Sequence, residues 1–189
     1  MFCVLSQVSV LGFIRPAEYL HLKGGHSLNN QPAQAPISIV TDEMKGKYLT
    51  FWTFGQLLGI PISLVVQIVG MQGIIAMPEF PAYAKGVINL RGNIIPVIDM
   101  RLRLNQPEAE YNERTCIIVT NIHNSYVGFI VDEVNEVLTI EDDVISPPPR
   151  MASAKSSYIS GIAKLDKNVA LLIDAQRLLD DNELEALNL

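Results

Sequence analysis

From Tyr48 onward, short apolar runs alternate with polar and turn-forming residues. The runs are four to eight residues long and rich in Ile, Val, Leu and Phe, and Gly, Pro and Asn separate them. Short, β-branched runs bounded by turn residues are typical of strands. The pattern predicts eight strands, at Tyr48–Phe54, Leu58–Ile62, Val87–Leu90, Ile94–Ile98, Thr115–Asn121, Tyr126–Val131, Tyr158–Leu165 and Val169–Ile173.

The two ends of the chain have a different pattern. The tail from Asp174 has helical spacing of its leucines, and Asp174 itself is a suitable helix N-cap. We therefore expect a short C-terminal helix within residues 174–189. Residues 1–46 contain scattered Gly, Pro, Asn and Gln, which predicts an irregular or disordered lead.

An internal repeat organises the region between these ends. The segment 83–99 aligns without a gap on 158–174, at an offset of 75 residues, and 59–68 aligns on 128–137 at an offset of 69. Tyr, Gly, Leu, Asn, Ile and Asp recur at matching positions of the longer alignment. Matched polar positions of this kind indicate a duplicated structural unit. The repeat positions that we expect to serve turns and the fold are Gly86, Asn93 and Asp99 in the first copy and Gly161, Asn168 and Asp174 in the second.

Each copy is the size of a small barrel of about five strands. Asn93 and Asn168 are expected in tight hairpin turns, because Asn tolerates positive φ. Two barrels this small are expected to share a hydrophobic seam. The predicted fold is all-β, with a first barrel at about 47–104, a second at about 114–173 and the polar stretch 105–113 between them.

Composition and charge exclude several classes of protein. The chain is 49% hydrophobic and 18% charged, a balance that argues against extensive disorder. Its formal net charge is −6 and it has no long basic run, so we expect neither nucleic-acid binding nor direct insertion into a membrane. The apolar start of the chain lacks the basic residues of a secretory signal, and the two cysteines form no framework. A cytoplasmic location is expected.

No constellation of reactive side chains points to catalysis. The histidines, at 21, 26 and 123, have no Cys or second His at metal-ligand spacing, and Cys116 lies within an apolar strand. We therefore expect no metal and no cofactor. A small acid/base enzyme using Asp99 or Asp174 is the alternative from another class. Residues repeated in both halves serve the fold more often than one asymmetric active site, here by capping the segment after the strand.

Arg91 stands out in the turn of the first copy. Strongly apolar strands flank it, and its counterpart in the second copy is Asp166, so the repeat itself does not require an arginine. One interpretation is an ordinary surface turn residue. The other is a guanidinium that anchors a partner through a carboxylate or carbonyl group.

The segment Gly86-Val-Ile-Asn-Leu-Arg-Gly-Asn-Ile-Ile-Pro-Val-Ile-Asp-Met-Arg101 closely resembles the signature of the CheW family of bacterial chemotaxis coupling proteins. Further matches follow in the family's order, at 48–51, 59–62, 77–78, 128–138, 158–161 and 172–174, and the resemblance covers about residues 47–180. It implies two SH3-like five-stranded barrels on a shared core. It also implies a non-enzymatic scaffold that couples methyl-accepting chemoreceptors to the histidine kinase CheA.

The resemblance also implies partners and sites. The partners would be the regulatory domain of CheA and the cytoplasmic tips of the receptors, with recruitment of the cytoplasmic protein to receptor arrays. Arg91 and Gly92 match the coupling turn, and Val65 and Gln67 match positions beside the receptor groove. The family usually has a glutamate at Gln67, so an amide–guanidinium bond to Arg91 would replace an ion pair.

Two further points follow from the resemblance. Pro61 replaces a frequent aspartate and removes a strand donor, which suggests an edge or a bend. An adaptor of another chemosensory pathway, such as twitching motility, remains an alternative function.

Overall fold

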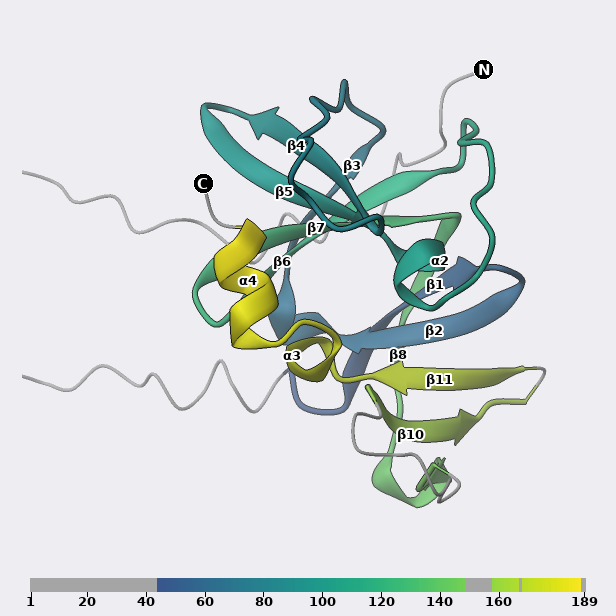
Figure 1. Ribbon diagram of the computed structural model, residues 1–189. Coiled ribbons are helices and arrows are strands. Elements are labelled where there is room, and N and C mark those ends of the chain that lie inside the picture. The colour runs from purple at the N-terminus through teal and green to yellow at the C-terminus, as the bar shows by residue number, and fades with distance from the viewer. Residues whose placement is uncertain (1–43, 149–157, 167, 188–189) are drawn as a thin grey trace, which may run out of the picture.

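The structure is a computed structural model that describes residues 44–148, 158–166 and 168–187. Two stacked sheets form the molecule, with the short helices at the seam between them (Figure 1). The six-stranded sheet has the order β8 (Glu133–Thr139), β1 (Lys47–Thr53), β2 (Gln56–Pro61), β11 (Val169–Ile173), β10 (Ile159–Lys164) and β9 (Ile145–Ser146). The five-stranded sheet has the order β3 (Val65–Gly70), β6 (Cys116–Ile122), β7 (Ser125–Val131), β5 (Asn93–Asp99) and β4 (Ala84–Leu90).

The mostly-β class is confirmed, and all eight predicted strands are present with ends shifted by a few residues. Three strands were not predicted: β3, β8 and the two-residue β9. β3 and β8 are edge strands whose residues are mostly half-buried or exposed, and polar residues interrupt their apolar runs, at Gln67 in β3 and at Asn135 and Glu136 in β8. In the part of the chain that the structure describes, two 3₁₀ turns, Ile62–Leu64 and Asp142–Val144, follow β2 and precede β9.

The C-terminal segment contains two short helices where the sequence predicts one. These are α3 (Ala175–Leu178) and α4 (Asp181–Leu187). Leu179 is extended between them and fully buried, which breaks the helix. Asp180 and Glu183 then form a reciprocal capping box: the Asp180 N–H donates to Glu183 Oε2 at 3.1 Å, and the Glu183 N–H donates to Asp180 Oδ1 at 2.8 Å. The predicted lead lies outside the described residues, apart from a turn at 44–46.

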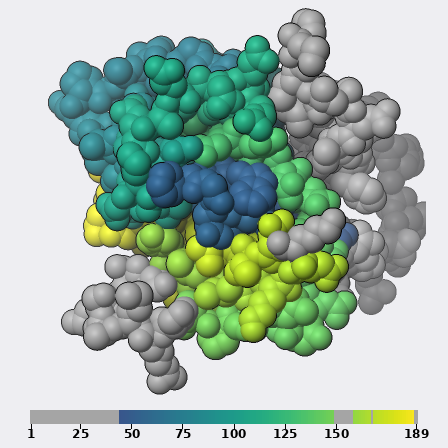
Figure 2. Space-filling model, turned by 90° about the vertical axis from the view of Figure 1, so that its right-hand side faces the viewer, coloured from purple at the N-terminus to yellow at the C-terminus, as the bar shows by residue number. Residues whose placement is uncertain are grey.

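The two halves of the chain exchange strands. β8, from the second half, pairs with β1, and β3, from the first half, pairs with β6. β2 lies parallel to β11, and β5 lies parallel to β7. Each sheet therefore combines a hairpin of one half with the later strands of the other. The stretch 105–113 does not separate the sheets, because β5 before it and β6 after it belong to the same sheet. The hydrophobic pattern could not predict this, since it fixes which residues are buried but not which strand lies beside them. In Figure 2, blue atoms of β1 and β2 lie between teal atoms above and yellow-green atoms below.

The helix after each half starts in the same way. Asp99 is the N-cap of α2 (Met100–Arg103), and Asp174 is the N-cap of α3. The backbone N–H of Asp99 donates to the Tyr83 carbonyl at 2.8 Å, and that of Asp174 donates to the Tyr158 carbonyl at 2.8 Å. The same local structure thus recurs at the 75-residue offset.

A glycine-dependent bulge also recurs. The register of β4 and β5 shifts between Ala84 and Gly86, and that of β10 and β11 shifts between Ile159 and Gly161. A Cβ at Gly86 would lie 2.1 Å from the carbonyl oxygen of Ile75, at a φ of +135°. Only glycine fits there.

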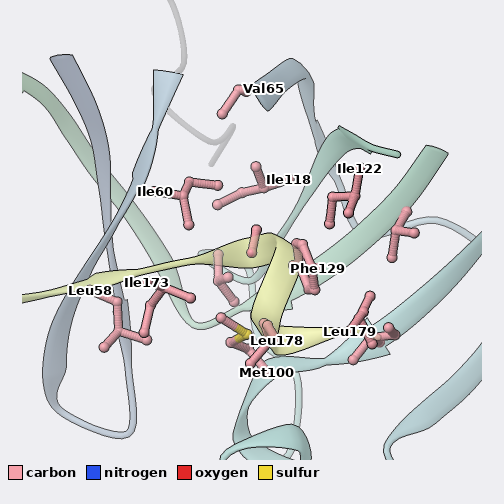
Figure 3. Packing of buried hydrophobic residues seen from close by; sticks show 14 of the residues in the cluster. Leu58, Ile60, Val65, Met100, Ile118, Ile122, Phe129, Ile173, Leu178 and Leu179 are labelled. Atoms are coloured by element: carbon pink, nitrogen blue, oxygen red, sulfur yellow. The ribbon is translucent and has the colours of Figure 1, made fainter. Parts of the chain in front are cut away.

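Apolar side chains of the described residues form three clusters. The largest joins the two sheets, which confirms the shared core, and ten of its members are labelled in Figure 3. Phe51 and Leu58 reach it from one sheet, and Ile118 and Phe129 from the other. Two smaller clusters fill the individual sheets, one around Ile88 and Val97 and the other around Leu57 and Leu172.

Pro61 is the last residue of β2, which runs between β1 and β11. Of the two expectations, an edge strand or a bend, the edge strand is not found, and the chain leaves the sheet at Pro61 through the 3₁₀ turn. The parallel pairing with β11 covers only Leu57–Gly59, so the missing N–H of Pro61 costs no bond there.

Candidate functional site

The tip of the β4–β5 hairpin is a two-residue turn formed by Arg91 and Gly92. Both have positive φ, 53° and 92°, and the Gly92 N–H donates to the Asn89 side-chain oxygen at 2.8 Å. The positive φ was expected at Asn93, but Asn93 starts β5 with ordinary backbone geometry. Asn89 therefore supports this turn from two residues before Arg91, by accepting a hydrogen bond.

Arg91 is exposed and makes no hydrogen bond or ion pair with any described residue. A left-handed conformation costs a non-glycine residue about 1–2 kcal/mol. Strain of this kind persists where the surrounding structure enforces it, and it is common at functional sites. The guanidinium is therefore held at the tip of a fixed turn with its hydrogen-bonding capacity unused among these residues.

An exposed apolar residue follows each of the two hairpin turns. Ile94 and its repeat counterpart Val169 are each 50% exposed. The charge at the corresponding turn differs, because Asp166, exposed in the second hairpin, stands where Arg91 stands in the first. The two equivalent positions thus carry opposite charges. Asn168, at the second turn, is also exposed.

The β3 residues named from the resemblance differ in their surroundings. Val65 is 9% exposed and packs in the shared core, and Gln67 is half-buried at the edge of the five-stranded sheet. A register shift between them leaves Val66 41% exposed. The expected bond from Gln67 to Arg91 is absent from the described part of the chain, because β3 and β4 are the two outermost strands of their sheet.

The repeated aspartates are occupied as hydrogen-bond acceptors. Asp99 Oδ1 accepts from the backbone N–H groups of Arg101 and Leu102, and its Oδ2 accepts from the Tyr111 hydroxyl at 2.8 Å. Burial, followed by this bond, raises the pKa of Tyr111. Asp174 Oδ1 accepts from the two backbone N–H groups of its own helical turn. Both carboxylates have the geometry of helix caps.

A bidentate ion pair, which sequence reasoning missed, lies near Asp99. Arg101 Nε is 2.7 Å from Asp132 Oδ1, and Arg101 Nη2 is 2.6 Å from Asp132 Oδ2. This carboxylate also accepts the backbone N–H of Phe54 at 2.8 Å, and the guanidinium lies 5.6 Å from the Phe54 ring. Hydrogen bonding to Asp132 raises the pKa of Arg101. The pair borders a cavity of about 250 Å³. Arg101 and Asp132 are 31 residues apart in the chain, so no local sequence pattern predicts their contact.

A second polar cluster ties the C-terminal segment to the first half. Arg103 Nη2 is 3.0 Å from Glu183 Oε2, and the Tyr83 hydroxyl donates to Glu183 Oε1 at 2.8 Å. Arg103 also donates to the Leu178 carbonyl and lies over the Tyr83 ring at 4.8 Å. The cluster holds α4 against α2 across the seam.

The described ranges contain no group of three or more His, Cys, Asp or Glu residues that could hold a metal ion. Within the same ranges, no helix is long and apolar enough to cross a membrane.

Comparison with known proteins gives concordant matches. The model of the CheW-like domain matches residues 47–183. A probable chemotaxis protein CheW of Rhizobium etli is 38% identical over 128 residues, which cover 67% of this chain and 83% of the relative. The chemotaxis protein CheW of Bacillus subtilis is 37% identical, over 71% of this chain and 86% of its own length. The crystal structure of the scaffolding protein TtCheW from Thermoanaerobacter tengcongensis superposes with a TM-score of 0.67 at 34% identity, over 73% of this chain and 94% of that one.

Proposed function

The chain belongs to the CheW family, and we propose that it binds two partners: the regulatory domain of CheA and the cytoplasmic tips of methyl-accepting chemoreceptors. The family consists of non-enzymatic chemotaxis scaffolds that couple receptors to CheA. The protein would act in the cytoplasm and join the receptor arrays there.

The observation that carries this proposal is the hairpin tip with Arg91. An exposed guanidinium without a partner among the described residues is free to form a charge-assisted hydrogen bond with a carboxylate or carbonyl of another protein. Ile94, three residues further along, adds exposed apolar surface to the same hairpin. A charged group beside apolar surface is a common composition of protein interfaces.

The β3 edge is a candidate for the second contact. Gln67 is half-buried and Val66 is exposed beside it, while Val65 supports them from the core. Signal transfer would then depend on differential binding: a receptor state that changes the affinity at one surface changes how the kinase is held at the other.

The proposal is tested by titrating the purified full chain with the CheA regulatory domain and, separately, with a receptor-tip fragment. We expect saturable binding of both, and formation of a ternary complex when all three are mixed. Failure of the folded protein to bind either one would overturn the proposal.

A further inference from the structure

A second cavity lies between the end of β2 and the start of α3. Its volume is about 310 Å³, at the lower end of the range for ligand pockets. Its walls come from β1, the 3₁₀ turn after β2, β10, β11 and α3, and the lining residues that matter below are Pro61, Ser63, Leu64, Ser160, Asp174 and Gln176.

This cavity is the repeat counterpart of the one beside the ion pair. Ser63 corresponds to Asp132 at the 69-residue offset, and Gln176 corresponds to Arg101 at the 75-residue offset. The capping residue Asp174 likewise corresponds to Asp99. The two cavities are thus built on the same framework.

In the first cavity, the polar side chains are bonded to other side chains of the same chain. Arg101 is paired with Asp132 there, and Tyr111 donates to the second oxygen of Asp99. In the second cavity, Gln176 and Ser63 replace the charged pair with two neutral side chains.

The carboxylate of the second cavity remains accessible. The second oxygen of Asp174 is 3.1 Å from Arg177 Nε, but that arginine side chain is 68% exposed, so the pair is worth little and is easily exchanged. The hydroxyl of Ser160 donates to the Leu172 carbonyl and keeps its lone pairs as acceptors.

The remaining walls suit an aliphatic stem. Pro61 and Leu64, which are half-buried, provide most of the apolar surface, because Ile173 and Ala175 are each only 1% exposed. Long basic side chains bury their methylene groups on such surface and direct the charged head to acceptors. Burial, and then the negative charge of Asp142, raises the pKa of Tyr48 at the cavity wall.

We propose that this cavity binds an arginine side chain of a partner protein, with the stem on the apolar walls and the guanidinium on Asp174. In the equivalent cavity the chain's own guanidinium, that of Arg101, pairs with Asp132 and also feels the charge of Asp99, the counterpart of Asp174. Ser63 replaces Asp132 here, so Asp174 is the carboxylate that a guanidinium would meet, and the planar fork of arginine suits a carboxylate better than a lysine ammonium does. The inference goes beyond the proposed function, because none of Val65, Gln67, Arg91 and Gly92 lines the cavity.

The test uses the full chain labelled with ¹⁵N and two probes, N-acetylarginine amide and its uncharged analogue N-acetylnorleucine amide. We expect saturable shifts of the backbone resonances of Ser63, Asp174 and Gln176 with the arginine probe only. Asp174→Asn keeps an N-cap residue but removes the charge, and should weaken binding about tenfold. Asp166→Asn removes one charge from an exposed turn and should leave binding unchanged.

A filling variant provides an independent arm. Ser63→Asp with Gln176→Arg copies the Arg101–Asp132 pair into the second cavity and should abolish the shifts while the melting temperature is kept or raised. If Asp174→Asn fails to fold, the single change Gln176→Arg replaces it, because an arginine of the chain itself should occupy the cavity and weaken binding of the probe. Absence of saturable shifts in the wild type would overturn the inference. Equal shifts in the wild type and in a folded Asp174→Asn or Gln176→Arg variant would also overturn it, because they would show diffuse ion pairing only.

Discussion

Arg101 and Asp132 join three parts of the molecule through one ion pair. The guanidinium belongs to α2, the carboxylate lies between β7 and β8, and the same carboxylate holds the Phe54 N–H at the tip of the β1–β2 hairpin. The backbone N–H of Asp132 also donates to the Trp52 carbonyl at 3.1 Å. A hairpin that belongs to one sheet is thereby fixed to a helix that follows a strand of the other. The arrangement of exchanged strands is therefore stabilised by this ion pair, here called the polar lock, as well as by the apolar core.

Loss of this lock should destabilise the fold. The two side chains are 21% and 28% exposed, so Asp132→Ala leaves a partly buried guanidinium and a backbone N–H without their acceptor. We expect a loss of about 2 kcal/mol in the free energy of unfolding, measured by urea denaturation. Glu133→Ala is the matched control, because its pair with Arg114 is largely exposed and should contribute less than about 1 kcal/mol. Equal effects of the two changes would contradict the assignment.

Alanine substitutions at the two bulge glycines, Gly86 and Gly161, and at Gly73 as a control test the bulge geometry. Gly86→Ala places a Cβ 2.1 Å from a backbone carbonyl at positive φ and should cost more than about 3 kcal/mol or prevent folding. Gly161→Ala brings its Cβ to 2.6 Å from a methyl group of the Ile145 side chain, which can shift, while its other neighbours lie at 3.7 Å, so it should cost less. Gly73→Ala has open space around it and should be nearly neutral. Thermal melts of the three variants give the order, and a stable Gly86→Ala protein would contradict the bulge geometry.

The C-terminal helix is expected to contribute to the shared core. Leu184 is 4% exposed and belongs to the largest cluster, so Leu184→Ala should cost about 2–4 kcal/mol. Glu185→Ala, an exposed change in the same helix, controls for altered helix propensity and should have an effect below about 0.5 kcal/mol. If both variants unfold at the same urea concentration as the wild type, α4 does not pack as described.

Stability should fall at alkaline pH, partly through Tyr83. Burial, and then its hydrogen bond to Glu183, raises the pKa of Tyr83 to about 12 in the folded state. The ordinary value is 10.0, so the stabilising contribution is complete below pH 10 and is lost as the pH rises from 10 towards 12. Urea midpoints across this range should fall less steeply for Tyr83→Phe than for the wild type. Identical slopes would mean that Tyr83 ionises as it does in the unfolded chain.

Features that repeat within the chain could be predicted from the sequence. The capping aspartates and the eight predicted strands follow from short apolar runs and from residues that recur at fixed offsets, and each depends on local geometry. The shared core also follows, because two small barrels leave too much apolar surface to remain separate.

The strand exchange could not be predicted in this way. β3 and β8 occupy matching positions in the shorter alignment, so pairing within a half and pairing between halves satisfy the same hydrophobic pattern. The ion pair of Arg101 with Asp132 depends on that exchange and was missed with it. Asn93 was assigned the positive φ because Asn tolerates it, whereas Asn89 stabilises the turn and Arg91 adopts the strained conformation.

The most direct test of the coupling role is the affinity of Arg91→Ala for the CheA regulatory domain, with Asp166→Ala as the control at the repeat-equivalent turn. Arg91 makes no bond to a described residue, and alanine keeps the same Cβ at the positive φ, so the change adds no backbone strain to the fold. We predict that Arg91→Ala raises the dissociation constant about tenfold or more at an unchanged melting temperature, while Asp166→Ala leaves it unchanged. An unchanged dissociation constant for Arg91→Ala would contradict that role. So would a raised dissociation constant that is accompanied, and explained, by a large fall in melting temperature.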